Sequence, residues 1–439
     1  MTVGSLHPAA ETTPLLQQRP FRMLQYTRFT SRVAQNAVNF ALVLLIVDET
    51  GKAFASALLV LALVIPSTVV GIVAGTAADH FPKRLLMVFG DLARAATCFY
   101  FFANEISVAG YYVVAVAVAT FAQFATSAEG AAMPCLVRKE QFARANAIKD
   151  AVGGASQVVG LAVLAPLLLR LLDSPDTLFA ICGVLYVVAA GQAILIGRIP
   201  RPDRREVGGE LRGASWWSAG WHAMKADNRV LHAAVELTLL STTLIVLAGL
   251  IPSYIEEVLG LPVDVGALVL LPAAVGIALG LRVAGFLAHR VPHAFLSTVG
   301  FTLFTVLLTL VTFVEREAEF LAGFGAFSWL GDVELGEFDG AGVLALMLMF
   351  PLGFAYSVVS VAAHTVINDL VPLHLQGRVG STQAAMAAVA SLVPVLAAGA
   401  LSDQIGVVPT MAIVCVAITV AAVAMLREPR SLRTEPLRV

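Results

Sequence analysis

Long apolar runs, separated by short clusters of charged and turn-forming residues, extend along most of this chain. At about 1.5 Å of rise per helical residue, each run is long enough to cross about 30 Å of hydrocarbon. The pattern therefore predicts an all-α polytopic membrane protein with twelve transmembrane helices. The predicted spans are residues 25–47, 54–77, 85–103, 107–130, 145–170, 177–198, 230–252, 264–287, 294–314, 342–364, 379–400 and 406–426.

The composition leads to the same class. Hydrophobic residues make up 58% of the 439 residues, charged residues only 13%, and the mean hydropathy is +0.84. Soluble globular chains carry about 25% charged residues. A soluble protein of this length has no core large enough to bury so much apolar surface, so this class is excluded.

The positions of Lys and Arg predict the orientation. With the N-terminus placed in the cytoplasm, 25 of the 28 basic residues fall on the cytoplasmic side, and only Lys52, Arg170 and Arg316 fall outside. The positive-inside rule predicts this asymmetry. One missed span would place the basic residues of all later loops on the opposite side and remove the asymmetry. We therefore expect cytoplasmic tails at 1–24 and 427–439. The first tail lacks a secretory signal, and we expect the protein in the cell (inner or plasma) membrane.

The longest cytoplasmic stretch, residues 199–229, divides the chain into six-helix bundles at 25–198 and 230–426. Its second part carries Trp216, Trp217 and Trp221 and predicts a helix at the membrane interface, where Trp side chains concentrate. Similar phrases follow the second and eighth spans and begin at Gly75 and Gly285, 210 residues apart. This internal repeat supports two homologous halves.

The segment after the second span contains Gly75, Asp79, Pro82, Lys83 and Arg84, with three residues between Gly and Asp and three between Asp and Lys. It resembles the loop 2–3 signature of the major facilitator superfamily, although His80 and Pro82 replace the usual Arg and Gly. Further phrases resemble the branch that holds macrolide-efflux proteins and enterobactin exporters. They are Pro134–Ala147, Asp91–Ala95 and Gly377–Val379.

The resemblance, which covers about residues 25–427, implies the major facilitator fold and alternating access, in which two bundles rock around a central cavity. It implies gating by Gly75, Asp79, Pro82, Lys83, Arg84, Asp91 and Arg94. We expect Gly75 to provide a tight turn and Asp79 to lie near a helix end, where it can pair with cations. Asp91 and Arg94, at i and i+3, can neutralise each other. The alternative is a basic loop that serves only membrane insertion.

Few ionisable or amide side chains fall at membrane depth, and those that do are the candidates for substrate binding and coupling. Glu129, Glu236, Arg32 and His364 fall on the fourth, seventh, first and tenth spans, which line the cavity in the resembled fold. A carboxyl in an apolar pocket can exchange protons near neutral pH. Gln35 and Asn39, at i and i+4 on the first span, either bind substrate or hold helices together. The candidates are Arg32, Gln35, Asn39, Glu129, Glu236 and His364.

The resemblance implies a secondary active transporter that exports amphipathic small molecules, such as drugs or siderophores, driven by an ion gradient, with protons as the expected ion. Alternatives are an importer or lysolipid flippase of the same fold, or a non-transporting receptor or scaffold. We expect a monomer in the lipid bilayer, a small-molecule substrate, and no nucleic acid, metal or cofactor. The sequence carries no phosphate-binding loop, HExxH motif or GxSxG elbow, so an enzyme is disfavoured.

Residues 315–341 form an unusual outer loop with seven acidic residues and several aromatic ones. A solvated loop accounts for the acids, because Asp and Glu scarcely affect topology. A lid or an external partner site is the alternative.

Overall fold

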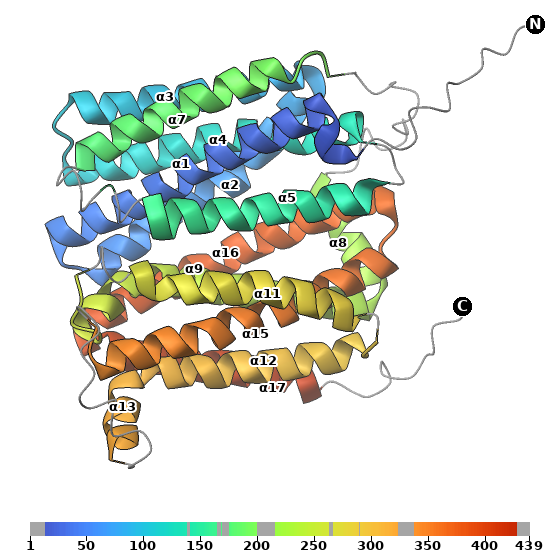
Figure 1. Cartoon of the computed structure of the whole chain (residues 1–439). Helices are drawn as coiled ribbons and strands as arrows, with labels where there is room; N and C mark the ends of the chain where they lie inside the picture. Colours follow the sequence, from blue (N-terminus) through green and yellow to red (C-terminus); the bar gives the residue numbers. More distant parts are fainter. Residues whose placement is uncertain are drawn as a thin grey trace, which may run out of the picture.

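The computed structural model describes residues 14–137, 141–164, 168, 175–199, 216–262, 267–288, 290–323 and 338–427. The described part is a bundle of long, nearly antiparallel helices (Figure 1). Ten of these helices are long and apolar enough to cross a membrane, and a shorter apolar helix covers Val407–Val423. The predicted all-α polytopic class is confirmed.

Within the described residues, each predicted span overlaps helical structure. In the N-terminal half the helices are α1 (Arg19–Thr50), α2 (Ala53–His80), α3 (Lys83–Ala103), α4 (Val108–Leu136), α5 (Phe142–Gln157), its π-helical continuation η4 (Val158–Leu164), and α7 (Pro175–Leu195). In the C-terminal half they are α9 (Asn228–Glu257), η5 (Ala267–Leu270), α11 (Leu271–Ala288), α12 (His293–Thr312), α15 (Gly340–Leu370), α16 (Leu373–Ile405) and α17 (Val407–Arg427).

Pro and Gly residues set several of the helix boundaries. Pro82, Pro292 and Pro372 occupy the position before α3, α12 and α16, so these helices begin at the same kind of connection in both halves. Proline favours helix starts because its fixed φ suits the helix and its missing N–H is not needed there. Gly51 ends α1 with φ of 59°, a left-handed conformation that glycine adopts without a Cβ clash.

The two halves lie one above the other in Figure 1. We call the end where α1 begins and α17 finishes the terminal side, and the opposite end, with the connections at Gly51 and Gly406, the distal side. The short helix α8 (Trp216–Ala226) precedes α9 and packs against α16, where Gly220 lies against Arg378 and Thr382. A helix in the middle loop was expected, but its close packing on α16 was not.

Two expectations about connections need correction. Gly75 lies inside α2, which continues to His80, and a Cβ on it would meet nothing within 4 Å, so it does not make a tight turn. The acidic outer segment, expected as a loop, begins with the short helix α13 (Val314–Ala322), whose first turn holds Glu315 and Glu317. Acids stabilise a helix N-terminus. The side chain of Asp339 caps α15 by accepting a hydrogen bond from Gly342 N at 2.8 Å.

Candidate functional site

The two halves meet directly at the distal side. Ala53, Ala57 and Leu61 of α2 belong to a buried apolar cluster whose other members come from the C-terminal half, including Leu250 and Tyr254 of α9. Among the described residues, this is the buried cluster that combines both halves. Apolar burial between the halves therefore concentrates at the distal end of α2.

Two glycines permit this close approach. A Cβ on Gly399 of α16 would lie 2.8 Å from Ala57 Cβ and 2.9 Å from Phe54 Cα, and a Cβ on Gly249 of α9 would lie 3.2 Å from Ala57 Cα. Real Cβ atoms essentially never approach another atom within 3.0 Å, so a larger residue at Gly399 would push the halves apart, and the 3.2 Å approach at Gly249 is tight. Small residues at helix interfaces are typical of close packing in membrane proteins.

A hydrogen-bonded cap reinforces the distal contact. The carboxylate of Asp403, near the end of α16, accepts hydrogen bonds from Ala53 N at 2.7 Å and Phe54 N at 3.2 Å. These N–H groups open α2 and have no partner within their own helix. A side chain of one half thus caps a helix of the other.

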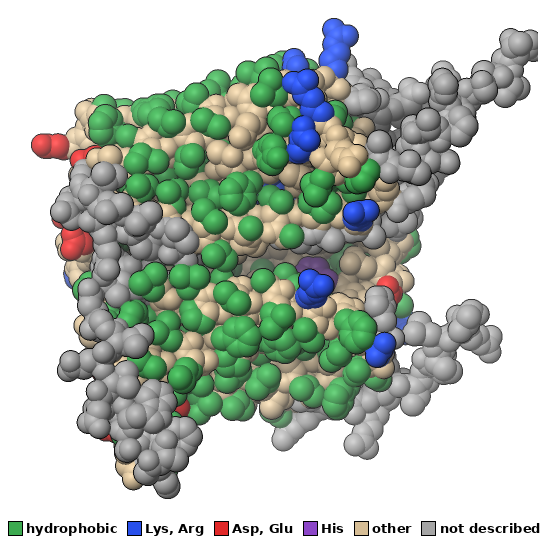
Figure 2. Space-filling view, viewed as in Figure 1, with side chains coloured by type: hydrophobic (Ala, Val, Ile, Leu, Met, Phe, Trp, Pro, Cys, Tyr) green, Lys and Arg blue, Asp and Glu red, His purple; other side chains and the backbone are tan. Residues whose placement is uncertain are grey.

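The terminal side lacks such a contact in the described part of the chain. One buried cluster there combines Leu24, Ala78 and Met87 with other residues of the N-terminal half, and another combines Met224 of α8 and Val230 of α9 with residues of the C-terminal half. Figure 2 shows a hollow between the halves, with a His and a Lys or Arg side chain at it. Among the described residues, the buried contact between the halves is on the distal side, and none of the buried clusters joins the two halves at the terminal side.

Two buried charge pairs lie inside the N-terminal half. Arg28 Nε of α1 donates to Glu129 Oε2 of α4 at 2.9 Å, and both side chains are almost completely buried. Asp91 and Arg94 of α3 form the second pair, also buried. Buried charges require such pairing, because an isolated ion is very costly in an apolar medium.

Arg94 is the centre of a network that joins three helices. Its guanidinium donates to Ser31 Oγ at 2.8 Å and Gln35 Oε1 at 3.1 Å, both on α1, and to Asp91 on its own helix. It also lies over the Tyr186 ring of α7, 4.5 Å from the centroid. Ser31 donates to Asp91 at 3.0 Å. The planar fork of Arg suits such simultaneous bonding.

The described residues contain no group of three or more His, Cys, Asp or Glu side chains that could hold a metal ion. The described residues offer two buried charge pairs in the N-terminal half and a hollow between the two halves.

The sequence comparison decides the family. Residues 26–333 match the sequence profile described as the Major Facilitator Superfamily. The chain belongs to the Major Facilitator Superfamily. It is a membrane transporter of the major facilitator fold, and the predicted fold class is confirmed in this respect too.

Solved structures agree with the fold. A bacterial homologue of the human lysosomal transporter Spinster, in an inward-facing and occupied conformation, has a TM-score of 0.73 at 13% identity and covers 97% of this chain and 100% of that one. A bacterial homologue of the iron transporter ferroportin, inward-facing, has 0.65 at 16% identity, covering 94% and 99%. The nucleoside transporter NupG has 0.65 at 12%, covering 93% and 100%. No curated protein matches the chain.

In this major facilitator chain, the predicted coupling candidates lie in different places. Glu129 is paired with Arg28 inside the N-terminal half. Glu236 lines a pocket between α9, α12 and α17, rather than the central cavity between the halves where we expected it. The side chains of Arg32 and His364 are exposed, and His364 Nδ1 lies 2.8 Å from Ser360 O one turn earlier.

The amides of the first span face one another. Gln35 Nε2 donates to Asn39 Oδ1 at 2.7 Å, and Gln35 Oε1 accepts from Arg94 and, at 3.3 Å, from Tyr186 OH. Of the two roles left open by the sequence, this geometry favours holding helices together.

The gating candidates do not form one cluster. Asp79 is the penultimate residue of α2, as expected, and its side chain lies outside the described part. Lys83 and Arg84 open α3 and are half-buried. Asp91 and Arg94 do pair at i and i+3, but their hydrogen-bond partners all lie in the N-terminal half, away from the contact between the halves. Their gating role stays a prediction.

Sequence reasoning missed four important residues. Arg28 counted only as a topogenic cation, and Ser31 and Tyr186 carried no signal, because their role comes from contacts across helices. Asp403 was recognisable only as an acid near the end of the eleventh span. Its partner is backbone 349 and 350 positions away, which no local pattern reveals.

Proposed function

We propose that this chain is a secondary active transporter that exports amphipathic small molecules by alternating access, driven by the proton gradient. The observation that carries the proposal is the asymmetry of the contact between the halves. On the distal side α2 packs on α9 and α16, whereas no buried cluster of the described residues joins the halves at the terminal side. That is one end state of a rocking transporter.

The distribution of Lys and Arg supports a cytoplasmic terminal side, so this state would face inward and accept substrate from the cytoplasm or inner leaflet. Export is supported by the resemblance of Asp91–Ala95 and Pro134–Ala147 to the macrolide-efflux and enterobactin-exporter branch. The proposed location is the cell membrane, and the proposed unit is a monomer.

For the gate, we place Asp79, Lys83 and Arg84 at the terminal end of α2 and α3. In the opposite state this end would close, and charged groups there would pair with the C-terminal half. Such pairs latch one state without blocking the other, because they break when the halves rock apart.

For coupling, the proposed proton acceptor is Asp91, with Glu129 as the second candidate. One oxygen of Asp91 is held by Ser31 and Arg94, and the other, Oδ2, is buried without a hydrogen-bond partner among the described residues. A proton bound there would neutralise the carboxylate and loosen its hold on Arg94, which bonds α1 and stacks on α7. The network would thus couple protonation to helix packing.

The test is accumulation of a panel of dyes and antibiotics in an efflux-deficient bacterium, with and without a protonophore. The wild type should lower accumulation of at least one compound, and the protonophore should abolish this effect. Asp91→Asn should abolish uphill export but keep exchange of substrate across the membrane, whereas Asp79→Asn should impair both. Asp48→Asn, an exposed acid at the distal end of α1, is the matched control. Raised accumulation would indicate import, and no effect on any compound would contradict the proposal.

A further inference from the structure

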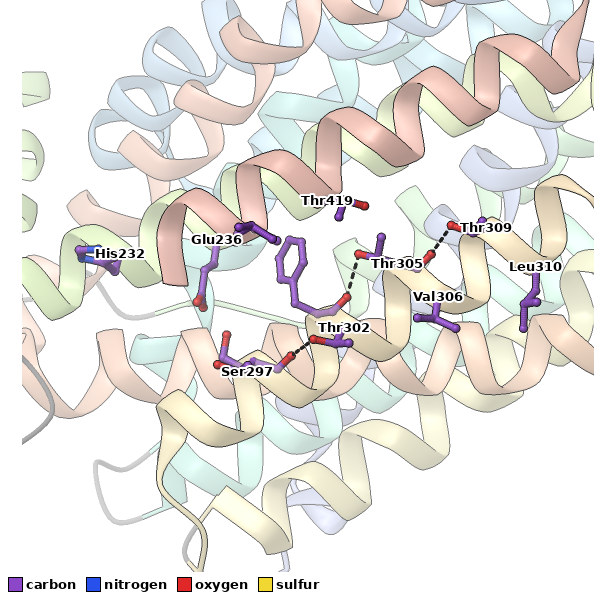
Figure 3. A pocket seen from close by; sticks show the side chains of 13 residues that line it. His232, Glu236, Ser297, Thr302, Thr305, Val306, Thr309, Leu310 and Thr419 are labelled. Atoms are coloured by element: carbon purple, nitrogen blue, oxygen red, sulfur yellow. Dashed lines mark hydrogen bonds between the residues drawn. The ribbon is translucent and has the colours of Figure 1, made fainter. Parts of the chain in front are cut away.

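A cavity of about 400 Å³ lies wholly within the C-terminal half, between α9, α12 and α17 (Figure 3). Its lining includes Glu236 of α9, Ser297, Phe301 and Thr305 of α12, and Thr419 of α17. The volume is in the range of small-molecule sites. The cavity is separate from the hollow between the halves, since its lining residues all belong to one of them.

Loose packing of the last helix creates the cavity. In the N-terminal half, α7 packs tightly along α1 and α3, with Phe179 stacked on Phe101 and Gly183 against Phe99. The Arg94 network fills the space where these three helices meet. The corresponding helix α17 has the same length but packs far less on α9 and α12. The repeat thus leaves in one half a space that is filled in the other.

The cavity opens sideways. Val306 of α12 is 51% exposed and Val423 of α17 is 39% exposed, and Thr302 and Thr419 are also exposed, while Phe301 and Ser297 on the inner wall are buried. In Figure 1, α12 and α17 lie at the edge of the bundle. An exposed face of an edge helix in a membrane protein faces lipid. A ligand would therefore reach this cavity from the bilayer.

Four threonines of the polar lining offer acceptors rather than donors. The hydroxyls of Thr302, Thr305, Thr309 and Thr419 each donate to the carbonyl four residues earlier, at 2.7–2.9 Å. Each hydroxyl has thus used its proton and keeps an accepting lone pair. The carboxylate of Glu236 accepts as well, and no Lys or Arg is among the described lining residues. Such a surface suits a ligand rich in N–H donors.

The charge is at one end of the cavity. Glu236 is half-buried and lies about two helical turns from the start of α9 at the terminal side, with His232 one turn before it. Figure 3 shows Glu236 and Ser297 directed toward each other, whereas Val306 and Leu310 lie farther along α12. The Ser297 hydroxyl is buried and faces the Glu236 carboxylate. A carboxylate at membrane depth is costly without a counter-charge.

From these observations we infer that the cavity binds a compact amphiphile with a protonated primary-amine head, taken from the leaflet on the terminal side. The ammonium lies between Glu236 and Ser297, and the chain follows the threonine-lined wall toward the bilayer centre. The inference deepens the proposed function by naming a substrate class and a route of access, but binding itself requires neither a gradient nor a direction of transport.

Binding of radiolabelled octylamine to the full chain in lipid nanodiscs tests this, with empty nanodiscs as the blank. Octylamine carries charge and N–H donors, octyltrimethylammonium carries charge alone, and octanol carries neither. Octylamine should bind saturably and be displaced only weakly by the other two. Glu236→Gln should weaken its binding about tenfold to a hundredfold, because a charge-assisted hydrogen bond is lost. Glu256→Gln, an exposed acid at the other end of α9, should not.

A second pair of variants tests the place. Thr419→Phe fills the cavity from the exposed rim and should abolish octylamine binding, while Val416→Phe, exposed on the same helix but outside the lining, should leave it intact. Absence of saturable binding, equal affinity in wild type and Glu236→Gln, or equal displacement by octanol would each overturn the inference. If octylamine binds as expected but the chain does not transport, the amine site stands and only the proposed export is refuted.

Discussion

Asp403 of the C-terminal half caps the helix that begins at Ala53 in the N-terminal half, with its carboxylate 2.7 Å from Ala53 N. Under the proposed alternating access, the contact would exist only while the distal side is closed, because rocking of the halves would separate α16 from α2. A cap of this kind contributes about 0.5–2 kcal/mol. Under the same proposal, Asp403 would bias the conformational equilibrium toward the state seen here.

Asp403→Ala should consequently favour the distal-open state. The expected shift in population is about 2-fold to 30-fold, the equivalent of the lost cap. Lys52 and Ile405 are exposed positions on the two halves at this end. Double electron–electron resonance between spin labels on Lys52→Cys and Ile405→Cys measures the distance between the halves there. Asp48→Ala, an exposed acid at the same end, is the control. An unchanged distance distribution in Asp403→Ala would show that the cap does not stabilise closure.

Gly399→Val should open the distal side more strongly, because its side chain has no space. The new Cβ would lie 2.8 Å from Ala57 Cβ and 2.9 Å from Phe54 Cα, and the backbone of α2 can yield only by moving away. Faster modification of a distal cysteine by a water-soluble thiol reagent measures the opening. Gly191→Val, where a Cβ meets nothing within 4 Å, should leave the rate unchanged. Equal rates in both variants would contradict the close contact.

Arg28→Met should destabilise the chain by about 3–5 kcal/mol, because it leaves the Glu129 carboxylate buried and unpaired. The double variant Arg28→Met with Glu129→Leu should recover most of this loss, since an apolar pair of similar size replaces a buried ion pair at little cost. Thermal unfolding in detergent compares the three proteins. A double variant no more stable than the single one would indicate that the pair is not the source of the effect.

Arg94→Lys should also destabilise, although the charge is kept. Arg94 donates to Gly90, Gln35, Ser31 and Asp91, and the ammonium of Lys has three donors and lacks the planar fork. At least one buried acceptor would lose its partner, at a cost of about 1–3 kcal/mol. Thermal unfolding measures this, with Arg229→Lys at an exposed ion pair as the control expected to change stability little. If Arg94→Lys were as stable as Arg229→Lys, the hydrogen-bond network of Arg94 would not contribute to stability as expected.

The start of α9 should loosen in acid. Hydrogen bonds from Arg229 lower the pKa of Asp227, whose side chain caps α9 by accepting from Arg229 N at 2.8 Å. Because the folded-state pKa is lowered, this stabilisation is present above the ordinary Asp pKa of about 4 and is lost as pH falls through the folded value. Hydrogen exchange of the first turn of α9 should accelerate at that low pH. In Asp227→Ala it should be fast at neutral pH already, and a slow exchange there would contradict the cap.

The sequence by itself determined the helices and their connections. Span length and apolar content are local properties, and so are the Pro and Gly residues at the connections, such as Pro82, Pro292 and Gly51. The pairing of Asp91 with Arg94 was also predictable, because i and i+3 are neighbours on any helix. The family followed from loop phrases that are contiguous in the chain.

Only the tertiary structure decided which helices touch, and therefore what the polar residues do. Arg28 finds Glu129 101 positions away, and Asp403 finds Ala53 350 positions away. The helix that carries Glu236 predicts a place in the central cavity, but the face that Glu236 occupies directs it into a pocket within one half. Every apolar span must match the thickness of the same bilayer. The sequence of a span therefore constrains the length of its helix strongly, but constrains weakly which other helices it packs against. The rotation and tilt that place each side chain arise from close packing among all the helices together.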